Sequence, residues 1–252
     1  MKNFLVFAFL SAIGLPVFGE SSAAINSATI NIGIPGGHPP WLYRDENTSE
    51  LKGVAFQFLD KLFAGTGLSP EIHEHENFVR LAAEVIKGTV DAGPFIFDDK
   101  EKAVDYPQVS CAELSYGRNT SYLYALEKSE ISPVDDIAKL YHLKIATTRV
   151  IDTHRYMPGF PKNNITLHRN PDDALKMIIS GRSDMTIIAP QTAAFWKKRQ
   201  GIALKPIAKV VDFELRLCFS HASLGKDRAG SYAKKINANI AGLIKASERQ
   251  RQ

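Results

Sequence analysis

The sequence predicts an α/β protein built from two similar lobes. Stretches in which apolar and polar residues alternate, typical of strands, are interleaved with amphipathic stretches, typical of helices. This order favours mainly parallel sheets. One turn also occurs twice: Gly88 and Asp91 follow one amphipathic stretch, Gly181 and Asp184 follow another, and each Asp begins a strand. Two units of the same design predict two lobes.

The first unit occupies the N-terminal part of the chain. Strands are predicted at residues 28–34, 70–76 and 91–96, and helices at 53–65 and 78–87. The first strand ends at a rigid loop, Pro-Gly-Gly-His-Pro-Pro-Trp, at residues 35–41. In the first helix the inward side is predicted to hold Val54, Phe58, Leu59, Leu62 and Phe63.

The second unit repeats this order. Strands are predicted at residues 144–148, 164–168 and 184–189. Asn170 can cap a helix that begins at Pro171, runs with Ala174, Leu175, Ile178 and Ile179 inward, and ends at Gly181.

Two alternating segments, residues 119–125 and 213–219, are predicted to carry the chain out and back between the lobes. The C-terminal region predicts a helix at residues 231–246, with Ile236, Ile240, Leu243 and Ile244 inward.

Composition excludes several classes of protein. The 252 residues are 44% hydrophobic, 10% aromatic and 23% charged, which is not the composition of a disordered, collagen-like or coiled-coil chain. The net charge of +4 is scattered, so no nucleic-acid partner is expected. No phosphate loop, nucleophile elbow or metal-binding helix occurs, and no cofactor is expected. His73 and His75 share a strand face but lack further ligands with metal-site spacing.

Residues 1–19 have the pattern of a secretory signal. Lys2 precedes an apolar stretch at residues 4–18, which Pro16 interrupts, and a peptidase cut before Glu20 is expected. The stretch is shorter than the roughly 20 apolar residues that a membrane span needs. The mature protein is therefore expected to be soluble and periplasmic.

The two cysteines, Cys111 and Cys218, leave two interpretations open. Export permits a disulfide between them. The alternative is a pair of small buried thiols. A CxxC or metal-binding spacing is missing from the sequence, so either interpretation is structural.

Several short segments stand in a recognisable order. They are Pro39-Pro40-Trp41, Leu51-Lys52-Gly53, the Gly88…Asp91 turn, Lys-Glu-Lys-Ala-Val-Asp-Tyr at residues 100–106, and the Gly181…Asp184 turn. In this order the chain resembles the periplasmic solute-binding proteins of family 3, which serve amino-acid ABC transporters and belong to the type 2 periplasmic-binding superfamily.

The resemblance implies a two-lobed type 2 fold with two hinge strands. Lobe 1 would comprise residues 20–118 plus 220–252, and lobe 2 residues 119–219. A small-molecule ligand would lie between the lobes, and an ABC permease in the inner membrane would be the partner. We expect a monomer.

The amino-acid clamp of the family is altered at both ends. The Arg that holds the ligand carboxylate aligns with Lys100, and the Thr that commonly precedes it becomes Phe97. The Asp that holds the ligand ammonium falls at Ala189, and the anion-binding turn reads Arg149 to Thr153. A lysine lacks the two-pronged fork of arginine. The departures favour a small polar or anionic, amino-acid-like solute over an ordinary zwitterionic amino acid.

Nine residues are candidate ligand contacts: Trp41, Phe78, Phe95, Phe97, Lys100, Thr148, Arg149, Thr153 and Gln191. Trp41 either walls the cleft or packs beneath the first helix, and Phe78 belongs either to the cleft or to the core. Lys100 either contacts an anion or belongs to a solvated charge run. Arg149 either joins backbone N–H groups around an anion or lies on the surface rim.

The predicted function is that of an exported periplasmic solute-binding protein for an ABC importer, without catalysis. One alternative is a cleft enzyme of the cyclohexadienyl dehydratase type, with Asp98, Asp99 or Glu214 as the acid. The other is a sensing or accessory module that docks to a membrane partner.

Overall fold

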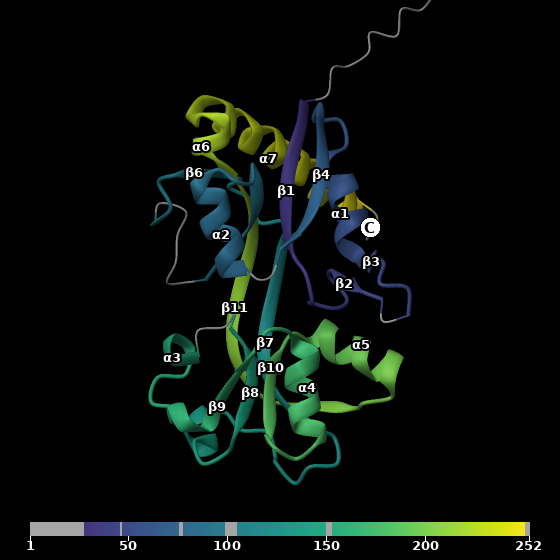
Figure 1. Cartoon of the computed structure of the whole chain (residues 1–252), viewed down its shortest axis with the longest axis vertical. Helices are drawn as coiled ribbons and strands as arrows, with labels where there is room; N and C mark the ends of the chain where they lie inside the picture. Colours follow the sequence, from purple (N-terminus) through teal and green to yellow (C-terminus); the bar gives the residue numbers. More distant parts are fainter. Residues whose placement is uncertain (1–27, 46, 76–77, 99–104, 150–152, 250–252) are drawn as a thin grey trace, which may run out of the picture.

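A computed structural model describes residues 28–45, 47–75, 78–98, 105–149 and 153–249. The expected signal peptide and Lys100 lie outside this part of the chain. Figure 1 shows two lobes, one above the other, joined by the long strands β7 (Gly117–Leu126) and β11 (Leu204–Ser220). The predicted α/β fold with two lobes and two hinge strands is therefore confirmed. None of the helices described is both long enough and apolar enough to cross a membrane.

The upper lobe of Figure 1 has a parallel core of strands. Strand β1 (Ala28–Pro35) lies between β4 (Leu68–His75) and β5 (Ala92–Phe97). The other elements are the hairpin strands β2 (Tyr43–Arg44) and β3 (Leu51–Lys52), the edge strand β6 (Val109–Cys111), and the helices α1 (Val54–Phe63), α2 (Phe78–Lys87), α6 (His221–Leu224) and α7 (Lys226–Arg249).

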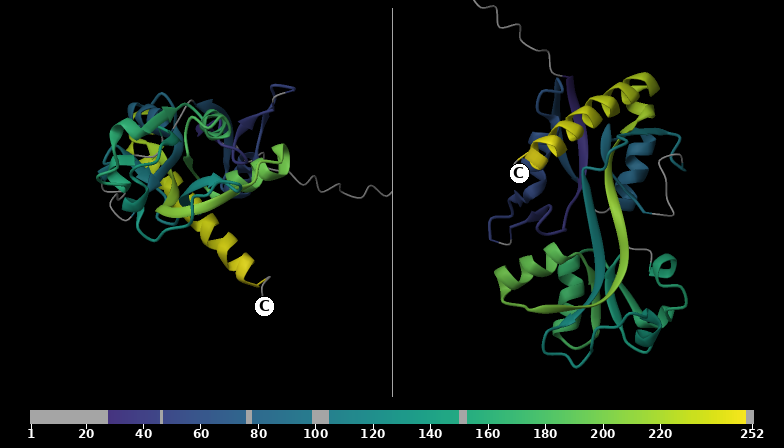
Figure 2. Two further views of the ribbon diagram at one scale, coloured as in Figure 1. Left: turned by 90° about the horizontal axis from the view of Figure 1, so that it is seen from below. Right: turned by 180° about the vertical axis from the view of Figure 1, so that it is seen from behind.

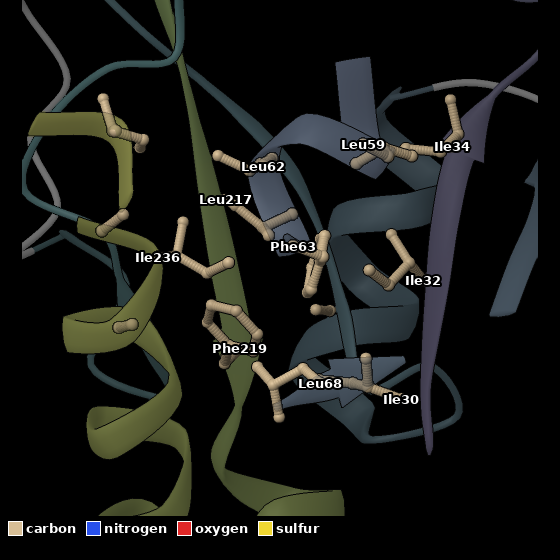
Figure 3. Close-up of a cluster of buried hydrophobic side chains, with 14 of the residues drawn as sticks. Ile30, Ile32, Ile34, Leu59, Leu62, Phe63, Leu68, Leu217, Phe219 and Ile236 are labelled. Atoms are coloured by element: carbon tan, nitrogen blue, oxygen red, sulfur yellow. The ribbon is translucent and has the colours of Figure 1, made fainter. Parts of the chain in front are cut away.

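Apolar residues of four elements meet in the upper core (Figure 3). The alternating residues Ile30, Ile32 and Ile34 of β1 face Leu59, Leu62 and Phe63 of α1, Leu217 and Phe219 of β11, and Ile236 of α7. Ile32, Leu62 and Phe219 are completely buried. Every second residue of β1 thus packs against the apolar side of α1, as the sequence predicts.

The lower lobe repeats the parallel order. Strand β8 (Ile145–Thr148) lies between β9 (Ile165–His168) and β10 (Met185–Ile188). The helices are α3 (Thr153–Tyr156), α4 (Pro171–Ile179) and α5 (Pro190–Gln200), with 3-10 helices η2 (Ile137–Leu140) and η3 (Lys162–Asn164). Trp196 of α5 is completely buried, and its indole N–H donates to Asp172 at 2.7 Å.

The repeated turn makes the same contacts in both lobes. Asp91 Oδ2 accepts a hydrogen bond from Asn31 N at 2.9 Å, and Asp184 Oδ2 accepts one from Lys144 N at 2.7 Å. In return the backbone N–H of each aspartate donates to the carbonyl of the same partner residue. Each aspartate therefore ties the start of one strand to the neighbouring strand, and the sequence repeat is a structural repeat.

Besides Val54, which lies at the cavity described below, three apolar residues predicted to face inward are exposed. Leu243 and Ile244 of α7 are 36% and 42% exposed, because the C-terminal half of this helix projects beyond the lobe (Figure 2). Ile179, the last residue of α4, is 50% exposed. These assignments were wrong because a periodic stripe does not show where the packing partner of a helix ends.

The hinge strands make the sheet continuous through both lobes. Strands β7 and β11 pair in antiparallel fashion from Leu204↔Leu126 to Leu215↔Gly117, with two register shifts. Because β11 also pairs with β5 and β7 with β10, nine of the eleven described strands form one sheet, in the order β4-β1-β5-β11-β7-β10-β8-β9 with β6 beside β11, and β2 and β3 pair separately. The predicted lobe boundaries stay a prediction. Leu217 and Phe219 pack in the upper core, so we propose that lobe 2 ends before residue 217.

A disulfide joins Cys111 of β6 to Cys218 of β11, which face each other in the antiparallel pair. Of the two interpretations left open by the sequence, the bridge is the one present. It closes a loop that spans lobe 2, with a sequence separation of 107 residues. Both ends of this loop lie in the upper lobe, so the bridge ties the hinge strand β11 there to β6, the strand that precedes β7.

Candidate functional site

A cavity of about 360 Å³ lies where the two lobes meet. From the upper lobe, it is lined by the loop that follows β1, the first residues of α1 and α2, and the end of β5. The lower lobe contributes the ends of β8 and β10 and the beginnings of α4 and α5. Open α/β sheets bind ligands at the carboxyl ends of their strands, and this cavity occupies that position in both lobes.

The hinge strands present different chemistry on their two faces. Ser121 of β7 and Val211, Phe213 and Leu215 of β11 line the cavity. The intervening residues, among them Thr120, Asp212, Glu214 and Arg216, line only a second, larger hollow of about 1300 Å³. The two hollows adjoin, because both are bordered by Arg118, Asn119, Tyr156, Gln191, Val211 and Phe213. The alternation of side chains along a strand thus gives the ribbon one mainly apolar face and one charged face.

Ion pairs neutralise the charged face, and one of them joins the two hinge strands. Arg118 Nη2 lies 2.8 Å from Glu214, and Arg216 Nη2 lies 3.1 Å from the same carboxylate. The hydrogen bond from Arg216, with the charge of Arg118, lowers the pKa of Glu214 below its usual value. Likewise Thr120 and Lys209 hydrogen-bond to Asp212. Glu214 is therefore ionised and held between arginines, which makes it a poor proton donor.

The sequence left open whether Trp41 walls the cleft or packs beneath the first helix, and in the structure it does both. It lines the cavity, and its ring stacks on Tyr116 at 6.4 Å and is tilted against Phe58 at 5.7 Å. Burial raises the pKa of Tyr116, so its ring is neutral. The tryptophan is thus fixed from behind by two aromatic rings of the upper lobe.

His38 lies beside Trp41 in the same loop. Its ring contacts the edge of Phe78, with centroids 5.8 Å apart. Burial lowers the pKa of His38 to about 4, so the imidazole is neutral at neutral pH. His38 Nε2 and Trp41 Nε1 are buried and have no hydrogen-bond partner among the described residues.

The structure brings four of the nine predicted contacts together. Trp41, Phe78, Thr148 and Gln191 line the cavity, so Phe78 too belongs at least in part to the cleft. Arg149 is exposed and Thr153 is buried, and neither lines the cavity. Lys100 lies outside the described residues.

Phe95 and Phe97 do not line this cavity, although Phe97 borders the larger hollow. They are 2% and 3% exposed, and the ring of Tyr106 contacts both edge-on. Ile96, between them, faces the cavity instead. This division follows from strand geometry, because neighbouring side chains of β5 point to opposite faces.

Sequence reasoning missed most of the apolar lining. The residues it did not single out include His38, Val54, Ile96, Ile187, Ile188, Val211, Phe213 and Leu215. Val54 was expected in the core and is 47% exposed, since it lies at the cavity. The alternation of residues 213–219 was a usable signal, because a hinge strand that crosses a cleft must turn one face into it.

The lobes touch on both sides of the cavity. On one side, Arg155 donates to Asp98 Oδ1 at 2.9 Å, and the Tyr156 hydroxyl donates to the same carboxylate, whose side chain is fully buried. On the other side, Thr192 Oγ1 donates to the carbonyl of Pro39 at 2.8 Å in a buried hydrogen bond. The arrangement is that of two lobes closed against each other.

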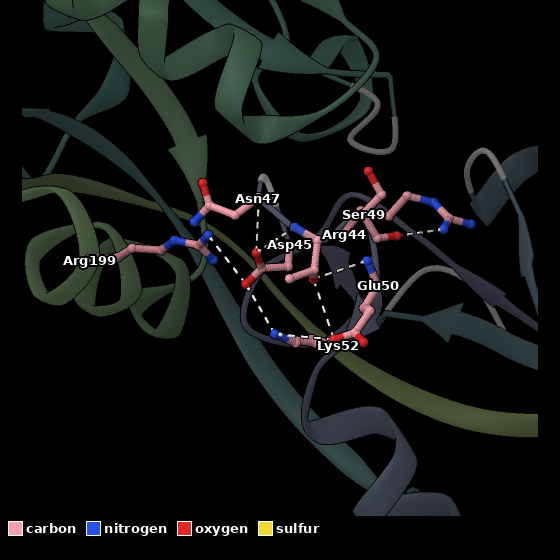
Figure 4. Close-up of polar contacts among 8 residues, drawn as sticks. Arg44, Asp45, Asn47, Ser49, Glu50, Lys52 and Arg199 are labelled. Atoms are coloured by element: carbon pink, nitrogen blue, oxygen red, sulfur yellow. Dashed lines mark hydrogen bonds and ion pairs between the residues drawn. The ribbon is translucent and has the colours of Figure 1, made fainter.

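A third contact lies at the outer rim (Figure 4). Arg199 of α5 reaches Asp45 in the β2–β3 loop, with Nη2 and Oδ2 3.8 Å apart. The same guanidinium lies over the ring of Tyr43, which meets Phe195 edge-on at 5.0 Å. Backbone hydrogen bonding from Asn47 and a side-chain bond from Lys52 lower the pKa of Asp45, so the acceptor is charged.

Comparison with solved structures shows the same fold. A histidine kinase sensor domain with similarity to periplasmic binding proteins superposes with a TM-score of 0.71 at 17% identity, covering 90% of this chain and 94% of that one. Holo ArgBP from T. maritima gives 0.67 at 14% identity, covering 86% and 90%. A putative L-cystine ABC transporter protein from Listeria monocytogenes gives 0.68 at 17% identity, covering 87% and 91%. No protein-family model and no curated protein matches the chain.

Proposed function

We propose that this chain is an exported, periplasmic solute-binding protein that captures a small molecule between its lobes and delivers it to an ABC importer in the inner membrane. The observation that carries this proposal is the cavity, because both lobes and both hinge strands line it. A ligand in it contacts both lobes fully only when they are closed. Its binding energy therefore favours the closed form, which a permease can distinguish from the open one.

The structural neighbours support this function, since two of them are ArgBP and a putative L-cystine ABC transporter protein. The expectation of a polar or anionic, amino-acid-like solute depends on Lys100 and Arg149. If a charged solute binds, replacing either residue by alanine should weaken its binding and leave the melting temperature of the free protein nearly unchanged.

Thermal unfolding in a metabolite panel tests the proposal. A ligand that binds only the folded protein stabilises it, by about 2.7 kcal/mol at a concentration of 100 Kd. We expect one compound class to raise the melting temperature and to change the fluorescence of Trp41, and Trp41→Phe to lose the fluorescence response. Cooperative unfolding without a shift for any compound would contradict a binding role.

A sensing module is the second candidate, and the similarity to a histidine kinase sensor domain favours it. In that case a sensor ectodomain should capture the purified protein without any added small molecule. Capture only by a permease, and only with ligand, would support transport instead.

We do not propose an enzyme. Of the three acids considered, Glu214 is held between two arginines, Asp98 is bonded to Arg155 and Tyr156, and Asp99 lies outside the described residues. We expect prephenate-like acids to show no turnover. Turnover that disappears in Asp98→Asn would contradict this expectation.

A further inference from the structure

The walls of the cavity are mostly apolar, and both lobes and both hinge strands contribute to them. Aromatic side chains line it from four places: Trp41 after β1, Phe78 at the start of α2, Tyr156 at the end of α3, and Phe213 on β11. Branched aliphatic residues complete the walls, among them Ile96 from the upper lobe and Ile187 from the lower lobe. Aromatic side chains offer large flat contact surfaces, and they pack best against another ring or an apolar group.

The ionisable groups at the wall are already neutral or paired. Of the described lining residues, His38, Arg118 and Tyr156 are the ones that titrate or carry charge. His38 is neutral, and the hydroxyl of Tyr156 donates to Asp98. The Arg118 side chain is 82% exposed and bonded to Glu214 on the other face of the hinge. Among these residues, a charged ligand group would therefore lose its hydration and meet only one charged side chain, an arginine that is already paired with a carboxylate.

The dimensions also limit the ligand. The volume of the cavity is about 360 Å³. This is the lower end of the usual range for small-molecule sites, about 300–1,000 Å³. A single ring with a short substituent fills such a space.

From this lining we propose that the cavity binds a small, uncharged, ring-bearing compound with at most one or two hydrogen-bonding groups, and that it discriminates against amino acids and other charged solutes. The inference rests on the proposed binding function and names its ligand class. One hydroxyl or carbonyl on the ligand matches the small polar content of the wall, which includes Thr148, Ser121 and Gln191.

A matched series of phenyl compounds tests the ligand class. The probes are 2-phenylethanol, which is neutral, phenylacetate, 2-phenylethylamine and phenylalanine, titrated into the whole mature protein at neutral pH by calorimetry and Trp41 fluorescence. We expect 2-phenylethanol to bind at least about tenfold more tightly than each charged analogue, because the charge must be buried unpaired.

Two neighbouring residues of α2 give a matched pair of variants. Phe78 lines the cavity, whereas Val79 is 66% exposed and does not. Phe78→Ala should weaken binding of 2-phenylethanol about fivefold or more, and Val79→Ala should leave it unchanged. Both variants are checked for cooperative unfolding, and Phe78→Leu replaces Phe78→Ala if the latter does not fold.

The outcomes separate this inference from the proposed function. Tighter binding of phenylalanine or phenylacetate, weakened by Lys100→Ala or Arg149→Ala, would overturn the ligand class and leave a solute-binding protein. If Phe78→Ala left the affinity for 2-phenylethanol unchanged, this would overturn the assignment of the cavity as its binding site. Failure of 2-phenylethanol to bind at millimolar concentration would overturn the ligand class, and failure of the whole metabolite panel would overturn the proposed function as well.

Discussion

Single residues at the cavity are held in uncharged states by burial and by their neighbours. His38 is the clearest case, because its pKa of about 4 lies well below the value of 6.5 for a free imidazole. Between these two pH values the unfolded chain binds a proton at His38 and the folded chain does not. Stability from the neutral imidazole is therefore present above pH 6.5 and is lost as the pH falls toward 4.

Replacing His38 by glutamine should remove this pH dependence. We expect the free energy of unfolding of the unmodified protein to fall by about 3 kcal/mol more than that of His38→Gln between pH 7 and pH 4. Denaturant titrations at several pH values measure the difference. His142→Gln, at an exposed histidine, serves as the control and should follow the unmodified protein. Equal slopes for the unmodified protein and His38→Gln would contradict a buried, neutral His38.

Prediction from the sequence was least accurate at the residue scale. Resemblance identified the end of β5 as a site but chose Phe95 and Phe97, whereas Ile96 between them faces the cavity. The choice between two faces of one strand depends on the register with its neighbours. Pairing of Leu215 with Ile96 sets that register here, and no local pattern in residues 92–97 reveals it, since all of them are apolar or glycine.

Elements with strong local signals were predicted closely. Helix α4 begins at Pro171 behind the Asn170 cap, whose Oδ1 accepts from Asp173 N at 2.8 Å, as the sequence indicates. Helix α5 was not predicted, because its second half, Lys-Lys-Arg-Gln, lacks an apolar stripe and its burial depends mainly on Trp196 and Ala193. The helix is positioned by its packing against the lower lobe and not by a pattern in its own sequence.

The repeated aspartates allow a prediction for each lobe separately. Asp184→Ala should destabilise the lower lobe by about 1 kcal/mol, because Lys144 N loses its charged acceptor. Hydrogen exchange should then quicken in β8 and β10 and stay unchanged in β1 and β5. Asp91→Ala should give the reverse pattern through Asn31 N. Asp135→Ala, at an exposed loop position, is the control. If either substitution quickened hydrogen exchange equally in both lobes, this would contradict the expectation that each aspartate stabilises only its own lobe.

For the molecule as a whole, three sets of contacts oppose opening of the lobes, and two of them flank the cavity. Asp98 with Arg155 and Tyr156 lies on one side of the cavity, and Thr192 with Pro39 lies on the other. The two-lobed plan followed from the order of segments, but these contacts could not be predicted. They join loops and helix ends that are far apart in sequence, such as residues 39 and 192, and their pairing exists only once both lobes are placed.

Removing one contact should shift the molecule toward the open form. Thr192→Val keeps the shape of the side chain and leaves the Pro39 carbonyl without its donor, which costs the closed form about 1 kcal/mol, or roughly a fivefold change in the closed-to-open ratio. Open lobes expose that carbonyl to water, so the open form loses nothing. X-ray scattering should show a larger radius of gyration, and ligand affinity should fall by up to about the same factor. Thr166→Val, at an exposed position of β9, is the matched control and should change neither quantity.

Because Arg199 also bridges the lobes at Asp45, Thr192→Val with Arg199→Ala should open the molecule further than either change alone. An unchanged radius of gyration in the double variant would show that the hinge strands, rather than these contacts, set the closed geometry.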